Sequence, residues 1–206
     1  MDTIPAGSFA AWARATQMVL RTSGTADVPC EGCTACCRSA QFIHVAPDEA
    51  EALARIPKAL LAPAPGLPSG HVVMGYDERG HCPMLVDDRC SIYEHRPRTC
   101  RTYDCRVFNA TGVDVDHKPL IAERVARWRF DTTDDVDARH AAAVHAAAEF
   151  VADRADRAVL AVAIHDLFLD GPPDPATVTR EIERRTSAAP TPSSGRRTDR
   201  SNRGRG

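Results

Sequence analysis

The stretch CEGCTACCRSA, Cys30–Ala40, places four cysteines within eight residues, and the last two are adjacent. Such density indicates a disulfide framework, a metal site or a redox thiol centre. Four further cysteines follow, so that the chain contains a C-x2-C-x2-C-C block and then a C-x7-C-x9-C-x4-C block. The eight positions are Cys30, Cys33, Cys36, Cys37, Cys82, Cys90, Cys100 and Cys105. Their confinement to one half of the chain argues against a scatter of ordinary core cysteines.

Composition narrows the choice among these three kinds of site. The 206 residues are 43% hydrophobic and carry a net charge of −2, which argues against a chain that coats nucleic acid over its length. The first 24 residues have no basic start followed by a pure apolar run, since Arg14 and Gln17 interrupt it, and they predict an amphipathic helix, not a signal peptide. Since no membrane span is expected, we predict a cytoplasmic protein. Thiols stay reduced in the cytoplasm, and clustered cysteines there favour metal or redox chemistry over structural disulfides.

The spacing of the first block suits metal ligation. Two residues between cysteines let a tight turn bring both sulfurs to one ion, at about 2.3 Å from zinc. A run of such spacings also occurs in iron–sulfur proteins, and all-sulfur tetrahedral coordination suits zinc and iron alike. We expect Cys36 and Cys37 to point to opposite faces of an extended backbone, so that one joins the first centre while the other faces a second centre or the core. The partition of the eight thiolates stays open: two sites of four, or one four-cysteine cluster plus four others.

Both blocks resemble one known family. The segments CEGCTACC and CPMLVDDRCSIYEHRPRTCRTYDC are similar to the CxxCxxCC, or YkgJ-like, cysteine-cluster proteins, with Cys-Pro-x-Leu, Cys-x-Ile-Tyr and Arg-Pro-x-x-Cys-Arg in order. The resemblance covers residues 28–105 and implies a zinc- or iron-chelating domain, in some members an iron–sulfur protein. One branch modifies flagellin, but this chain has no glycine-rich nucleotide loop that would support a methyl donor.

Residues around the cysteines suggest how a centre would be stabilised. Arginines lie close in sequence to the last two cysteines and would offset the negative charge of a four-thiolate site, or form a solvated face or an anion-binding patch: Arg96, Arg98, Arg101 and Arg106. Tyr93 and Tyr103 are expected to pack over the site. His81, beside Cys82, is an alternative ligand.

The remaining segments predict a mainly helical α+β fold. Hydrophobic periodicity predicts a helix over residues 8–21, and Pro119 opens another in which Ile121, Val125 and Trp128 share a face. A long alanine-rich helix, interrupted near Ala155, ends at the GPPDP segment. Short strands are expected within 41–46 and 71–93, separated by a proline-rich loop.

We therefore predict one domain over residues 1–170 and a disordered basic tail over 171–206. Within the domain, an N-terminal helix (1–29) and a helical region (119–170) pack against an irregular cysteine-rich metal-binding region with short strands (30–118). The last 27 residues carry a charge of +5 against −7 for the remainder, so nucleic acid is not expected as a partner, except weakly through the basic tail.

Three function classes follow from this sequence. The first is a zinc- or iron-binding protein with eight thiolate ligands, and the second is an iron–sulfur redox protein or enzyme, with a [4Fe-4S] cluster, that acts in protein modification. The third is a binding module whose metal only folds the domain. No catalytic motif is recognisable, which favours a protein that is not an enzyme, and the metal ion is the one partner that the sequence indicates.

Overall fold

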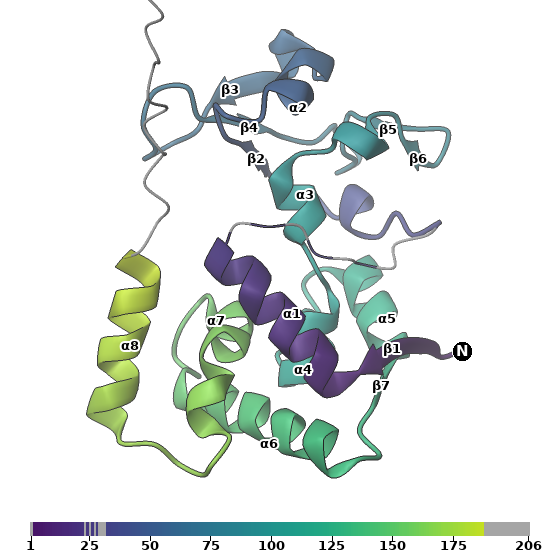
Figure 1. Ribbon diagram of the computed structural model, residues 1–206. Helices are drawn as coiled ribbons and strands as arrows, with labels where there is room; N and C mark the ends of the chain where they lie inside the picture. Colours follow the sequence, from purple (N-terminus) through teal and green to yellow (C-terminus); the bar gives the residue numbers. More distant parts are fainter. Residues whose placement is uncertain (1, 23, 25, 27, 29–31, 188–206) are drawn as a thin grey trace, which may run out of the picture.

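The computed structural model describes residues 2–187 except 23, 25, 27 and 29–31. Figure 1 shows a larger helical part and a smaller part with short strands, joined through the segment around α3. Helices dominate the described residues and the strands form small sheets, so the predicted mainly helical α+β class is confirmed. None of these helices combines the length and the apolar character needed to cross a membrane.

The helical part contains most of the regular structure. Its elements are β1 (Ile4–Ser8), α1 (Phe9–Thr22), α4 (Arg106–Thr111), α5 (Pro119–Arg127), β7 (Trp128–Asp131), α6 (Asp135–Phe150), α7 (Arg157–Ile164), η4 (His165–Phe168) and α8 (Pro175–Ser187). Helix α1 packs on α6 and α7. The predicted N-terminal helix and the predicted break in the alanine-rich helix are both confirmed.

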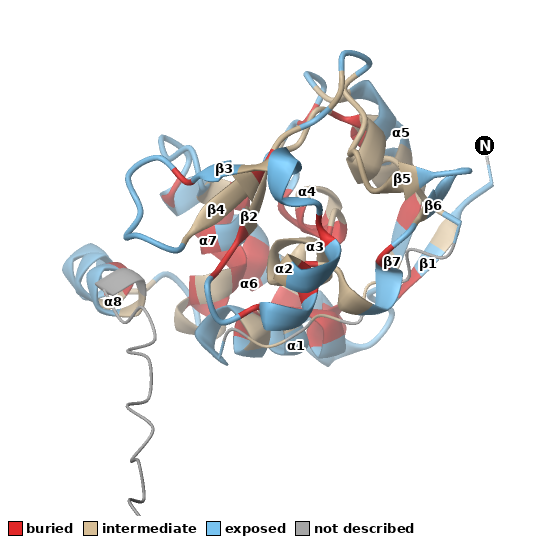
Figure 2. Ribbon diagram, turned by 90° about the horizontal axis from the view of Figure 1, so that it is seen from above, coloured by how far each residue is buried: buried red, intermediate tan, exposed pale blue. Residues whose placement is uncertain are grey.

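Two apolar clusters hold these helices together. Phe9 and Trp12 of α1 meet Val144 of α6 and Val162 of α7, and the two valines are fully buried. A second cluster joins α6, α7 and α8 through small and branched side chains. Buried segments, red in Figure 2, accordingly lie along α1, α6 and α7. Full burial of an apolar side chain of this size stabilises the fold by about 1.5–3 kcal/mol.

Strands β1 and β7 pair in parallel although more than 120 residues separate them. Ile4 lies opposite Trp128, and a register irregularity lies between Pro5 and Gly7. The expectation that Trp128 belongs to the same helix as Val125 is therefore wrong. The helix ends at Arg127, and Trp128 adopts an extended backbone that allows the pairing with β1.

The C-terminal boundary also differs from the sequence-based expectation. Residues 175–187, placed in the disordered tail, form α8, which contributes Val178 and Ile182 to the core. Arg185 of α8 pairs with Asp166 at 2.8 Å, which ties this helix to η4. Residues 188–206 lie outside the described residues, and the prediction for them stays a prediction.

The smaller part contains three strands in the order β2–β4–β3, all antiparallel: β2 (Ile43–Val45), β3 (Leu61–Pro63) and β4 (Val72–Met74). Beside them lie η1 (Cys36–Arg38), α2 (Ala50–Arg55), η2 (Lys58–Leu60), the hairpin of β5 (Leu85–Val86) and β6 (Arg89–Cys90), η3 (Tyr93–His95) and α3 (Arg98–Thr102). The core here is small, with Val45, Ile56, Met74 and Ile92 at its centre.

The start of α1 depends on a buried carboxylate from a distant helix. Ser8 Oγ accepts from the Ala11 amide at 3.2 Å and donates to Asp137 Oδ1 at 2.7 Å. The same Asp137 oxygen accepts from the Ala10 amide at 2.6 Å. Asp137 thus satisfies donors at the N-terminus of α1 from a position on α6.

We predict that Asp137→Ala lowers the free energy of unfolding by about 1–2 kcal/mol, because it removes a buried helix cap. Chemical denaturation measures this value. Asp135→Ala, at an exposed position in the same first turn of α6, is the matched control. Equal stability of the two variants would contradict the assigned capping role.

Two buried histidines form a hydrogen-bonded chain. His165 Nδ1 lies 2.7 Å from the Val162 carbonyl, which can only accept, so His165 donates there. Its Nε2 lies 3.1 Å from His140 Nδ1, and His140 Nε2 faces Arg14 at 3.4 Å. Neutral rings satisfy all three contacts when Arg14 donates to His140 Nε2 and His140 Nδ1 donates to His165 Nε2. The His165 Nδ1–H then donates to the Val162 carbonyl. Burial is the main cause that lowers the pKa of both histidines below the ordinary value of 6.5.

The protein should therefore lose stability as pH falls below about 6.5. Below this pH the two histidines become protonated in the unfolded chain, whereas burial keeps them neutral in the folded chain. Acid therefore favours the unfolded state. Urea denaturation at pH 7.5 and 5.5 measures the difference. His140→Gln should weaken the pH dependence, whereas His117→Gln, at an exposed position, should leave it unchanged. A pH dependence that survives in full in His140→Gln would show that this chain is not its source.

Candidate metal centre

The first cysteine block ends in a tight turn. Cys36 and Cys37 lie in the 3-10 helix η1, and the Arg38 amide donates to the Ala35 carbonyl at 3.2 Å. The sulfurs of Cys36 and Cys37 are 4.0 Å apart. The expectation that they point to opposite faces is therefore wrong, because the backbone is helical and not extended. Cys30 lies outside the described residues.

The second block begins on a hairpin. Cys82 precedes β5 and its carbonyl accepts from the Leu85 amide at 2.9 Å, while Leu85 lies opposite Cys90 on β6. The hairpin turns at Asp87 and Asp88, whose φ angles are 48° and 59°. Two central residues with positive φ are typical of the type I′ turn, which keeps the two strands of a short hairpin close. The turn therefore brings Cys82 and Cys90 to one end of the small part.

A backbone contact joins the two blocks. The Cys82 amide donates to the Cys37 carbonyl at 2.7 Å, and the Ala40 amide donates to the Gly80 carbonyl at 2.8 Å. Arg38 also forms an ion pair with Asp88 at the hairpin turn. Residues that are 45 positions apart in the sequence are thus held side by side by the main chain.

Cys100, on α3, lies among thiols from both blocks. Burial and then the nearby Cys82, Cys37 and Cys90 sulfurs raise its pKa to about 12, whereas Arg96 acts in the opposite direction. Burial also raises the pKa of Cys82 and of Cys90, with Cys37 contributing to each. Four thiols therefore interact electrostatically here, and they cannot all ionise without a cation to offset their charge.

Cys37 behaves differently from these neighbours. A hydrogen bond from Cys36 lowers the pKa of Cys37 to about 7, with help from Arg38 and against the effect of burial. Cys37 is therefore substantially ionised at neutral pH, whereas Cys100 stays protonated. The thiolate, and not the thiol, is the form that binds metal, so Cys37 is prepared for ligation.

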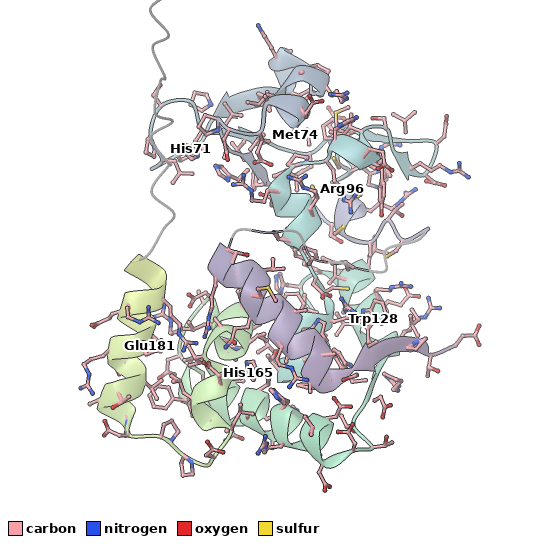
Figure 3. All side chains as sticks on the ribbon, in the orientation of Figure 1. His71, Met74, Arg96, Trp128, His165 and Glu181 are labelled. Carbon is pink, nitrogen blue, oxygen red and sulfur yellow. The ribbon has the colours of Figure 1, made fainter. Side chains whose placement is uncertain are left out.

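A second group of thiols surrounds Tyr103. Burial is the largest cause that raises the pKa of Tyr103, and the next contributions come from Cys105 and Cys36. Cys105, just before α4, has its pKa raised by burial and by Cys33, while an indole hydrogen bond from Trp128 at 3.3 Å lowers it. Figure 3 shows yellow sulfur atoms between the labelled side chains of Arg96 and Trp128.

The arginines near the last cysteines have different partners. Arg96 acts on the pKa of Cys90 and of Cys100, and its guanidinium lies 4.0 Å from the centre of the Tyr93 ring. The other three pair with carboxylates: Arg98 with Asp48, Arg101 with Glu49, and Arg106 with Asp104. Arg96 is thus the member of the predicted set whose charge acts on the thiols.

Two histidines of the region, His44 and His71, pair with each other. His44 Nε2 and His71 Nδ1 are hydrogen-bonded to each other at 2.9 Å, and their rings stack. Among the described residues, no three His, Cys, Asp or Glu side chains are arranged to hold a metal ion as they stand. Ligation at the cysteines therefore requires the thiols to turn toward one another. His81 as a ligand stays a prediction.

A comparison with protein families bears on this arrangement. Residues 29–124 match the family CxxCxxCC, described as "Putative zinc- or iron-chelating domain". This segment is therefore similar to that family. It covers a little under half of the chain and includes all four cysteines of each block. No curated protein and no solved structure matched the chain.

The matched segment extends beyond the cysteines to α5, and the structure supplies a reason. Lys118, at the start of α5, donates through Nζ to the Ser39 carbonyl at 2.6 Å and to the Ala40 carbonyl at 3.2 Å. These carbonyls follow η1, so Lys118 holds the end of the first cysteine block. Sequence reasoning missed Lys118, although its rarity was a signal: the chain has one other lysine, Lys58.

Lys118→Met should therefore loosen the segment around η1. We expect faster amide hydrogen exchange for residues 38–40, measured by mass spectrometry, because two carbonyls lose a charged donor. Lys58→Met, at an exposed position, is the matched control and should leave this exchange unchanged. Unchanged exchange in the Lys118 variant would rule out its role in holding the block.

Proposed function

We propose that this protein chelates zinc or iron through cysteine thiolates arranged in two adjoining sets. Cys37, Cys82, Cys90 and Cys100 form the first set. Cys33, Cys36 and Cys105 belong to the second, and the C-x2-C spacing predicts Cys30 as its fourth member. The observation that carries the proposal is the hydrogen bond from the Cys82 amide to the Cys37 carbonyl, which unites the two cysteine blocks.

The chemistry of the first set supports a cation. Three of its thiols have raised pKa values because they are buried near one another. A divalent ion replaces the protons and offsets the accumulated negative charge, so burial favours the metal-bound form over free thiolates. Six of the described cysteines, Cys33, Cys37, Cys82, Cys90, Cys100 and Cys105, are free thiols, which suits ligation in a reducing compartment such as the cytoplasm.

The modest core of the small part also supports a structural contribution from the metal. Its sheet has strands of three residues, and few apolar side chains are fully buried there. Small domains of this kind commonly gain folding free energy from a bound ion, because the ligands come from segments that lack other contacts. Chelation would add cross-links between η1, the β5–β6 hairpin and α3.

An iron–sulfur protein is the second candidate. The indole hydrogen bond from Trp128 to Cys105 favours it, because hydrogen bonds to sulfur and burial are the means by which proteins tune such clusters. Iron with sulfide and a brown absorption would identify a cluster, whereas a colourless protein with zinc would identify simple chelation. Electron transfer or protein modification would then be the activity to measure for the cluster.

Elemental analysis and a visible spectrum of the anaerobically purified protein test the proposal. If the cysteines form two separate sets, Cys100→Ser and Cys105→Ser should each remove about half of the bound metal, because each substitution disables one four-sulfur site. The double variant should retain almost none. Ser91→Ala is the matched control, since its hydroxyl donates to the Met84 carbonyl within the hairpin without contributing a sulfur.

Two results would contradict parts of this proposal. Unchanged metal content in both single variants would remove cysteine chelation as the function. Complete loss of metal in either single variant would instead show one joint centre and overturn the partition into two sets.

A further inference from the structure

Trp128 contacts the cysteine cluster from the helical part of the molecule. Its indole nitrogen lies 3.3 Å from Cys105 Sγ, within hydrogen-bonding range for sulfur. The side chain is 1% exposed, so water is not an alternative acceptor. An indole N–H can only donate, and a thiolate is a much stronger acceptor than a thiol. The contact therefore favours the form of Cys105 that binds metal.

The main chain fixes this indole independently of any ion. Trp128 ends the turn after α5 and begins β7, where it pairs with Ile4 of β1. Its carbonyl accepts from Arg129 Nη1 at 2.7 Å and from Asn109 Nδ2 at 3.4 Å. The donor is thus held in place by three elements before the sulfur turns toward a metal.

Positive charge lies over the same ring. The guanidinium of Arg124 is 4.7 Å from the ring centre, and that of Arg106 is 5.8 Å away. Arg106 is itself held by Asp104, which also accepts from the Trp12 indole at 2.8 Å. A cation over the ring face draws electron density from the indole and makes its N–H a better donor.

We propose that Trp128 is a positioning residue for the metal centre that contains Cys105. Its N–H donates to the metal-bound thiolate, orients that sulfur and withdraws charge from the metal–sulfur bond. This inference rests on the proposed chelating function and extends it, because it assigns control of one set of thiolates to a residue outside the cysteine blocks.

Cobalt(II) provides the test, because thiolate-to-cobalt charge-transfer absorption reports on the sulfur itself. Trp128→Phe keeps an aromatic ring and removes the N–H. We expect the charge-transfer band of this variant at longer wavelength and about tenfold faster loss of cobalt to a chelator, as for one lost hydrogen bond to a charged group. Circular dichroism establishes whether the variant is folded.

Trp12→Phe is the matched control. It removes an indole N–H from the same buried network but one that donates to Asp104 and not to sulfur. The band and the release rate of this variant should match those of the unaltered protein. Since the chain has two tryptophans, Trp128 is then the sole indole, and its fluorescence should change when zinc is added.

The outcomes distinguish a failure of the chelating function from a failure of the role assigned to Trp128. If the unaltered protein takes up no cobalt or zinc, the chelating function falls and the role of Trp128 falls with it. If it binds cobalt but Trp128→Phe shifts neither the band nor the release rate, the inference alone is overturned. If Trp128→Phe does not fold, the fluorescence of Trp12→Phe is the deciding measurement. Fluorescence that stays the same when zinc is added would overturn the inference.

Discussion

One backbone hydrogen bond holds together the part of the molecule on which the chemistry depends. The Cys82 amide donates to the Cys37 carbonyl at 2.7 Å and so joins a 3-10 turn to a hairpin that is distant in sequence. The Ala40–Gly80 hydrogen bond and the Arg38–Asp88 ion pair support this contact, and together they keep the two cysteine blocks side by side. Main-chain geometry thus assembles thiols from both blocks before any ligand contributes, which reduces the conformational entropy that binding must overcome.

The same assembly creates an electrostatic conflict. Burying thiols side by side raises the pKa of Cys100 to about 12, while the Cys36 hydrogen bond lowers that of Cys37 to about 7. The thiols of Cys100 on α3 and Cys37 on η1 thus differ in protonation at neutral pH. A bound cation would resolve the conflict, because it would take the place of the protons on the buried thiols.

The sequence predicted local features well and long-range pairings poorly. The helix of Phe9 and Trp12 and the cysteine blocks were recognisable because their signals lie within a few residues. Trp128 was assigned to a helix because its spacing from Val125 suits one, but strand pairing with Ile4, over 120 residues away, decides its backbone. The 4.0 Å between the Cys36 and Cys37 sulfurs was missed because the spacing does not reveal the backbone conformation.

The position of Cys105 connects the cysteine cluster to the helical part. Cys105 immediately precedes α4, and its sulfur accepts from Trp128, which pairs with β1 next to the capped start of α1. Cys33 and Cys36 come from the other side, on the segment that Lys118 holds. An ion bound by these three sulfurs would therefore cross-link the two parts of the molecule. Because α1, α4 and β7 share one apolar cluster, that cross-link would stabilise the whole fold and not the cysteine region alone.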